Sequence, residues 1–248
     1  MADGPRWPLG KPLPNADVLL GDLESPYALK HAAEAVARTV VNDDTGLTMR
    51  ELVMLATGPD ATSVDMTLNA MASLDTVGLG QHILLLADSA ETCGKFHGYP
   101  CYWSSRVLRV APSDSVTMQK FWDWRFRFYY VKKAYLSQLV SYGFSAIQAD
   151  TDTVWNHDPF PALRSIPSSL ITMADRGICN AGMVYARPGS RQTRDIIDEV
   201  AWRVQLFQHY PETVAKLVHY AKPPYYVSLH IYIIYIYTYI YVCVYTYI

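Results

Sequence analysis

The chain has 248 residues, of which half are apolar and 18% are charged, and its formal net charge is −2 at pH 7. This length and composition are typical of one globular domain with a sizeable core. They exclude a disordered chain and a strongly basic nucleic-acid-binding protein.

The first 26 residues are predicted to form a loose arm as far as Pro26. They are rich in Pro and Gly and contain no apolar run long enough for a signal peptide or membrane anchor. A helix is predicted next, over SPYALKHAAEAVARTVV, because Ser25 resembles a cap and the alanines have helical spacing. The NDDTG segment, from Asn42 to Gly46, ends it.

A βαβ unit is predicted from Glu51 onwards. ELVMLAT is a short apolar run that stops at Gly58-Pro59, and QHILLLADS is a second such run, ending in Asp88. Between them lies DMTLNAMASLDTVGLG, whose apolar positions 66, 68, 71, 74 and 77 indicate a helix. A strand, a helix and a strand at this spacing favour a parallel sheet.

A long amphipathic helix is predicted over FWDWRFRFYYVKKAYLSQLVSYG, with Gly143 as its C-cap. We expect it to pack its aromatic residues and to leave its basic residues solvated; these are Arg125, Arg127, Lys132 and Lys133. Before it, GYPCYWSS is a loop or short strand, and RVLRVAP is predicted to be another short strand.

Two aspartates end the next apolar strand, SAIQADTD. Asp150 and Asp152 would share one face of a strand, because side chains alternate. If the strand ends near Asp150, the pair lies at the carboxyl edge of the sheet, where open α/β folds bind ligands. Unpaired buried carboxylates are costly, so the pair requires a cation or a solvated cleft.

Three further elements follow in the chain. They are a strand SLITMAD ending at Asp175, a strand-like run CNAGMVYARPGS, and an amphipathic helix TRDIIDEVAWRVQLFQHY. The helix has an apolar stripe of Ile196, Val200, Val204 and Phe207. All these elements are assigned to one domain, residues 27–222.

The four cysteines lack the spacing of a zinc site. Cys93 and Cys101 either close a small disulfide loop in a secretory compartment or remain buried thiols.

The carboxyl terminus, residues 223–248, contains the low-complexity run LHIYIIYIYTYIYVCVYTYI. Alternating purine–pyrimidine codons such as ATA, TAT and TGT encode this alphabet, so we interpret the run as a translated microsatellite and a gene-model artefact. The alternatives are a tail anchor or an edge strand, although the many tyrosines would each need a partner in a bilayer.

A family resemblance rests on the block YLSQLVSYGFSAIQADTDTVWNHDPFPAL. It resembles the signature of the nucleotide-diphospho-sugar transferase family, which includes plant and algal arabinosyl-, xylosyl- and galactosyltransferases. CNAGMVYARPGSRQT resembles the family's later Asn-x-Gly strand, and the predicted βαβ unit resembles its nucleotide-binding half. The matching positions of the block are Gly143, Asp150, Asp152, Val154, Trp155 and Asp158-Pro159-Phe160-Pro161, and the resemblance covers roughly residues 51–203.

This resemblance implies a GT-A fold, a Rossmann-type mostly parallel sheet flanked by helices, here in a single domain that is incomplete at its carboxyl end. It implies Golgi localisation, a nucleotide-diphosphate sugar donor (a UDP-sugar is expected) and a glycan or glycoprotein acceptor. The Asp-x-Asp motif would hold Mn²⁺ or Mg²⁺ on the donor diphosphate. Such ions take one or two protein carboxylates and complete their shell with phosphate and water.

The site residues implied by the resemblance fall into two groups. Asp150 and Asp152 are the metal ligands, with Asp152 the stronger, and His219 is a weaker third candidate beside Lys222. The residues implied to bind the donor are Thr57, Gly58, Asp150, Asp152, Asp175, Asn180, Ala181 and Gly182. No covalent catalytic residue is implied.

Two other functions stay open at this point. The DTDTV box also fits a haloacid-dehalogenase-type phosphatase, in which Asp150 would be the nucleophile. The third is a non-catalytic, truncated remnant that binds sugar nucleotides without turnover.

Overall fold

The structure is a computed structural model, and it describes residues 20–25, 27–42, 45–96, 99–104, 124–175 and 178–209. At residue 20 and over residues 124–130, 173–181 and 202–209 only the backbone is described. The predicted RVLRVAP strand, His219, Lys222 and the low-complexity terminus lie outside these ranges.

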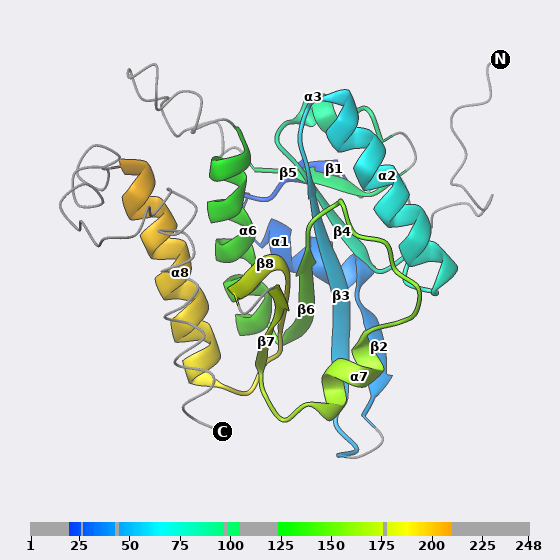
Figure 1. The fold of residues 1–248 in the computed structure, drawn as a ribbon, viewed down its shortest axis with the longest axis vertical. Helices are drawn as coiled ribbons and strands as arrows, with labels where there is room; N and C mark the ends of the chain where they lie inside the picture. The colour runs from blue at the N-terminus through cyan, green and yellow to red at the C-terminus, as the bar shows by residue number, and fades with distance from the viewer. Residues whose placement is uncertain are drawn as a thin grey trace.

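A mostly parallel sheet is the centre of the fold, as predicted (Figure 1). The described strands are β1 Leu20–Asp22, β2 Arg38–Val41, β3 Thr48–Thr57, β4 Ile83–Ala87, β5 Cys101–Trp103, β6 Phe144–Ala149, β7 Leu170–Asp175 and β8 Ile178–Ala186. Their order is β1-β5-β4-β3-β6-β8-β7, and the first five of these are parallel. Three strands are antiparallel: β2 on β3, β8 on β6, and β7 on β8.

Helices cover both faces of this sheet (Figure 1). They are α1 Ala28–Val36, α2 Ala61–Thr76, α3 Ala90–Cys93, α6 Trp124–Ser141, α7 Phe160–Ser165 and α8 Arg191–His209. The helices α1, α6 and α8 share one core with alternate residues of β3 and β6, such as Leu52 and Ala146. The helices α2 and α7 share the other core with the intervening residues, such as Val53 and Ile147. Successive side chains of a strand point to opposite faces of the sheet, so the core is divided into two layers.

The amino-terminal part differs from the prediction in two places. The helix expected from Ser25 begins only at Ala28 and ends at Val36, and Arg38–Val41 is strand β2. The β-branched Thr39, Val40 and Val41 favour this strand, which pairs with residues 48–51 of β3. Within the expected loose arm, Leu20–Asp22 forms β1, because the edge of β5 offers it parallel pairing.

The predicted βαβ unit is confirmed as β3, α2 and β4, and the predicted C-cap of α6 is confirmed at Gly143. This glycine has a φ of 83°, which a residue with a side chain adopts only with strain. A Cβ there would also lie 3.1 Å from Nη2 of Arg50. The chain therefore turns sharply at Gly143 from α6 into β6, and β6 leads directly to the Asp-x-Asp segment.

Candidate functional site

The carboxyl ends of the parallel strands β3, β4 and β6 meet at one edge of the sheet. Strand β3 lies between β4 and β6, so the strand order reverses there. Leu55 of β3 pairs with Ala149 of β6, and Thr57 therefore leaves the edge close to Asp150. Open α/β sheets bind ligands in the crevice at such a switch point.

The Asp-x-Asp segment lies in the turn that follows β6. Because the strand ends at Ala149, side-chain alternation along a strand does not orient Asp150 and Asp152, contrary to the prediction of a shared strand face. Asp152 is exposed, whereas Asp150 is partly buried. The Oγ1 of Thr153 donates a hydrogen bond of 2.7 Å to the carbonyl of Asp150 and closes the turn.

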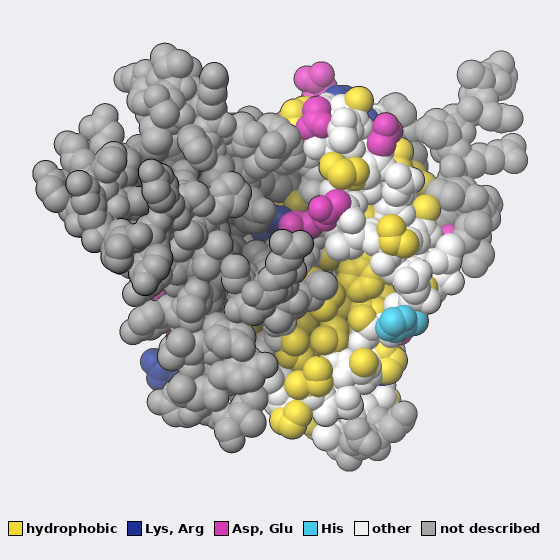
Figure 2. Space-filling view, in the orientation of Figure 1, with side chains coloured by type: hydrophobic (Ala, Val, Ile, Leu, Met, Phe, Trp, Pro, Cys, Tyr) yellow, Lys and Arg dark blue, Asp and Glu magenta, His cyan; other side chains and the backbone are white. Residues whose placement is uncertain are grey.

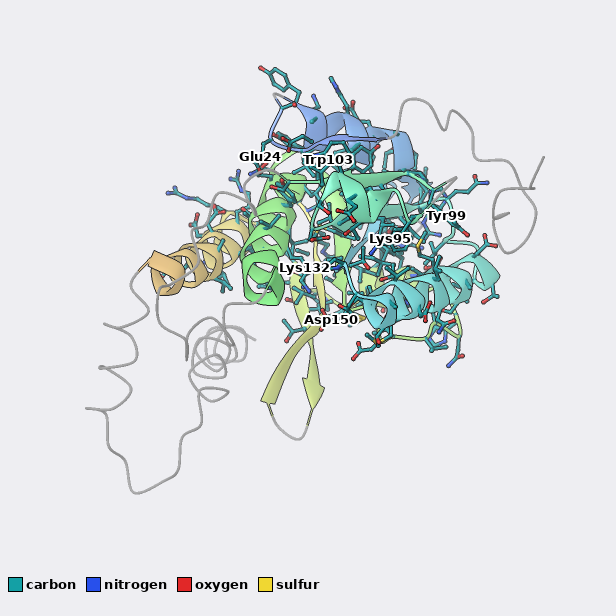
Figure 3. The ribbon with its side chains drawn as sticks, turned by 90° about the horizontal axis from the view of Figure 1, so that it is seen from above. Glu24, Lys95, Tyr99, Trp103, Lys132 and Asp150 are labelled. Atoms are coloured by element: carbon teal, nitrogen blue, oxygen red, sulfur yellow. A yellow bond between two sulfur atoms is a disulfide. The ribbon has the colours of Figure 1, made fainter. Side chains whose placement is uncertain are left out.

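Lys132 of α6 is the partner of Asp150. Its Nζ donates to Oδ1 of Asp150 at 2.7 Å, and the lysine side chain is 7% exposed while the aspartate is 29% exposed. Figure 3 shows the two residues side by side, with Lys132 reaching from its helix. The prediction that the lysines of this helix are solvated was wrong. Helix α6 is packed between the sheet and α8. These two neighbours cover a face of α6 that an isolated amphipathic helix would leave in water.

Lys133, the next residue, is also buried, being 3% exposed. Among the described residues its Nζ has no hydrogen-bond partner. The pKa of Lys133 is lowered to about 7, mainly by burial and secondly by the positive charge of Lys132, while the negative charge of Asp150 opposes both effects. An alternation of basic and aromatic residues does not distinguish a buried lysine from a solvated one, so sequence reasoning missed both lysines.

The β7–β8 hairpin carries the predicted sugar-pocket residues. The amide of Asp150 donates to the carbonyl of Gly182 at 2.7 Å, so the structure brings these two predicted residues together. Since Ala149 is the last residue of β6 to pair with β8, residues 178–182 lie beyond the end of β6. In Figure 3 the hairpin projects away from the sheet beside Asp150. Asp175, Asn180 and Ala181 belong to this hairpin, and the structure describes only their backbone.

Thr57 ends β3 and Gly58 begins the turn that leads to α2, and both are buried. The Oγ1 of Thr57 lies 3.4 Å from the carbonyls of Gly58 and Ser63, so this hydroxyl donates within its own turn. The side chain of Asp60 caps α2 by accepting from the amide of Ser63 at 2.9 Å. A ligand at this turn would therefore meet its backbone.

A disulfide joins Cys93 and Cys101, which decides between the two states left open by the sequence. It closes the segment between α3 and β5. Lys95 of this segment donates from Nζ to the carbonyl of Pro59 at 2.5 Å, so the closed segment contacts the turn after Thr57 and Gly58.

Asp150 and Asp152 fit a hard divalent ion that takes most of its coordinating oxygens from a bound phosphate and from water. Among the described residues no three His, Cys, Asp or Glu side chains form a metal-binding group. Asp152 is exposed, and one oxygen of Asp150 is engaged by Lys132. One or two carboxylates with phosphate oxygens and water are the usual shell of Mg²⁺. On the face seen in Figure 2, acidic side chains lie on the upper half and a hydrophobic area lies below them.

The Asp158-Pro159-Phe160-Pro161 turn has structural partners. Oδ1 of Asp158 accepts from the amide of Phe160 at 3.0 Å, and its Oδ2 lies 2.7 Å from Nη2 of Arg38. Phe160 is fully buried, and the amide of Trp155 donates to Oγ of Ser73 at 3.1 Å. This part of the motif anchors the loop on the fold.

A protein-family model described as "Nucleotide-diphospho-sugar transferase" matches residues 85–228, more than half of the chain. Among solved structures the chain is similar to a glycosyltransferase involved in the glycosylation of the major capsid of PBCV-1. The identity is 13%, the TM-score is 0.30, and the match covers 60% of this chain and 65%, less than two thirds, of that chain. No curated protein matches. Within the described ranges, no helix has the length and apolarity needed to cross a bilayer.

Proposed function

Since the chain belongs to the nucleotide-diphospho-sugar transferase family, we propose that it moves a sugar from a nucleotide-diphosphate donor to a glycan or glycoprotein acceptor. UDP is the expected nucleotide. The observation that carries this proposal is the Asp150–Asp152 turn at the carboxyl edge of the sheet, where the strand order reverses. The phosphatase alternative has no comparable support, because the family model that matches is a transferase model.

The two aspartates would divide the work at the donor diphosphate. Exposed Asp152 would be the main protein ligand of Mn²⁺ or Mg²⁺, and Asp150 would hold Lys132 and contribute its remaining oxygen. Bound there, the ion would offset the charge that develops on the leaving nucleotide diphosphate.

Lys132 would supply a second positive charge. Its side chain is 7% exposed, and electrostatic interactions are stronger in such a buried environment than in bulk solvent. Asp150 holds the amine at the sheet edge before any donor arrives, so little ordering of the side chain is required on binding.

The remaining predicted residues would surround the donor. The backbone of Thr57 and Gly58 would approach the nucleotide, and the β7–β8 hairpin would line the sugar pocket through Asp175, Asn180, Ala181 and Gly182. A hairpin that projects past the end of β6 is well situated to cover a ligand bound beside Asp150.

The proposed location is the lumen of the Golgi. The Cys93–Cys101 disulfide supports a secretory compartment, because disulfides persist in oxidising environments and are rare in the cytosol.

The test is calorimetry of UDP binding with and without Mn²⁺, together with an assay of sugar transfer or donor hydrolysis. We expect Mn²⁺-dependent UDP binding by the wild type and none by Asp152→Ala. Absence of Mn²⁺-dependent binding in the wild type would overturn the metal–diphosphate site. Binding without any turnover would support the non-catalytic remnant instead.

A further inference from the structure

A chain of ion pairs begins at a buried glutamate in the middle of β3. Glu51 is 0% exposed, and its carboxylate accepts from Nη1 of Arg164 at 2.8 and 2.9 Å. Its Oε2 also accepts from Nε of Arg38 at 3.0 Å, and Nη2 of Arg38 lies 2.9 Å from the same oxygen. The buried negative charge is therefore shared by two arginines, one from β2 and one from α7.

Arg38 extends this chain of ion pairs to the loop that carries the Asp-x-Asp segment. The same Nη2 lies 2.7 Å from Oδ2 of Asp158, and the guanidinium lies over the ring of Phe160, 4.9 Å from its centroid. Only a planar guanidinium with several donors can serve two carboxylates and a ring at once. Arg38 thus links the interior of the sheet to residues 158–160.

The loop between Asp150 and Phe160 is fixed at both ends and at its middle. Thr153 closes the turn at Asp150, the amide of Trp155 is held by Ser73 of α2, and Asp158 is held by Arg38. Between these attachments Asp152 and Val154 are exposed, and Val154 is 72% exposed. These attachments restrict the positions open to Asp152, in the way that partners behind a metal ligand orient it.

We propose that Arg38 and Asp158 are positioning residues that hold the Asp152 loop in place for the donor diphosphate and its metal. The Glu51–Arg38–Asp158 chain of ion pairs fixes the far end of the loop, and Asp152 is thereby kept beside Asp150. This inference rests on the proposed function, because it assigns the loop a role in metal–donor binding.

The test compares Asp158→Asn and Arg38→Lys with a matched control in the 248-residue chain. Asp158→Asn keeps an oxygen that accepts from the amide of Phe160 but removes the charge that Arg38 binds. Arg38→Lys keeps the positive charge but loses the planar guanidinium, whose several donors contact both Glu51 and Asp158. The control is Arg187→Ala, because Arg187 donates to the carbonyls of Arg164, Ile166 and Pro167 and so anchors the other end of α7.

Two measurements are made at a temperature where every variant is folded by circular dichroism. Calorimetric affinity for Mn²⁺ in the presence of UDP should fall about 10- to 100-fold in Asp158→Asn and Arg38→Lys, and stay near wild type in Arg187→Ala. Amide hydrogen exchange over residues 151–157 should rise in the first two variants and not in the control.

The outcomes separate this inference from the proposed function. Unchanged Mn²⁺–UDP affinity and unchanged exchange in Asp158→Asn and Arg38→Lys would overturn the positioning role and leave the transferase proposal intact. If wild type binds no UDP with Mn²⁺, the transferase site fails. The exchange of residues 151–157 then still decides whether the ion pairs hold the loop.

Discussion

The Nζ of Lys132 lies 2.7 Å from Oδ1 of Asp150, so the first aspartate of the Asp-x-Asp segment already has a cationic partner. This pair distinguishes the two aspartates, because Asp152 is exposed to solvent while one oxygen of Asp150 is bound by the lysine. It also connects α6 to the carboxyl edge of the sheet.

Lys132→Met is expected to lower kcat/KM for the sugar-nucleotide donor by about 100-fold, the usual loss for a preorganised charge at a reacting group. The variant removes the cation and leaves the partly buried Asp150 without it. Steady-state turnover of a UDP-sugar with Mn²⁺ measures the effect. Lys30→Met is the control, since the Lys30 side chain is 43% exposed and, among the described residues, its ion pair is with Glu34 at 3.9 Å on α1. Equal rates for the Lys132 variant and this control would contradict the role assigned to Lys132.

Replacing Cys93 and Cys101 by serine should lower the free energy of unfolding by roughly 2–3 kcal/mol, because the short closed segment restricts the unfolded chain. Thermal melting with and without reductant measures this change. The wild type should lose the same stability in reductant, whereas the double variant should not respond to it. A reductant-sensitive double variant would show that the bond is not the cause.

Much of the fold was predictable because the apolar runs are long and clearly bounded. The strands that became β3, β4 and β6 each contain a continuous buried run, and Gly143 marks the end of α6. Strand β2 was missed, because Arg38–Val41 follows the alanine-rich helix without a breaker and becomes a strand only by pairing with β3. Pairing between segments that are separated in the sequence is a tertiary effect, and the local pattern of apolar residues does not predict it.

The place of Asp150 and Asp152 just after a strand end was predictable from the apolar run before them, but their surroundings were not. Burial of Lys132 depends on α8 and the sheet closing around α6, and the partner of Asp158 comes from β2, far away in the sequence. The predicted roles of Asp175, Asn180 and Ala181 remain predictions, since only their backbone is described.

Glu51→Gln should destabilise the fold by about 3–5 kcal/mol, because removing one partner of a buried ion pair leaves the remaining charges uncompensated. Here Arg164 would lose its carboxylate partner, and Arg38, which also pairs with Asp158, would lose one of its two. Urea unfolding followed by circular dichroism gives the difference. Asp195→Asn is the control, since its pair with Arg191 is exposed on both sides and should contribute at most about 1 kcal/mol. Similar losses for the two variants would show that burial of Glu51 has no energetic consequence.

Lys133 should make the stability of the protein depend on pH. Its pKa is lowered to about 7 in the folded chain, mainly by burial, whereas in the unfolded chain the amine keeps its proton to about pH 10. Between these values the unfolded state binds more protons, so the free energy of unfolding should rise as pH increases from about 7 to 10. Below pH 7 the amine is protonated in both states and the cost of burying its charge is fully present.

Lys133→Met removes this titrating group and places an apolar side chain of similar length in the same buried position. We expect the variant to be more stable than wild type at pH 6–7 and to lack the rise of stability towards pH 9. Urea midpoints measured at intervals between pH 6 and pH 9 test this, and Lys30→Met should keep the wild-type dependence because Lys30 is solvent-exposed. A Lys133→Met profile parallel to that of the wild type would mean that the amine of Lys133 keeps its charge in the fold, and that Asp150 compensates both lysines of α6.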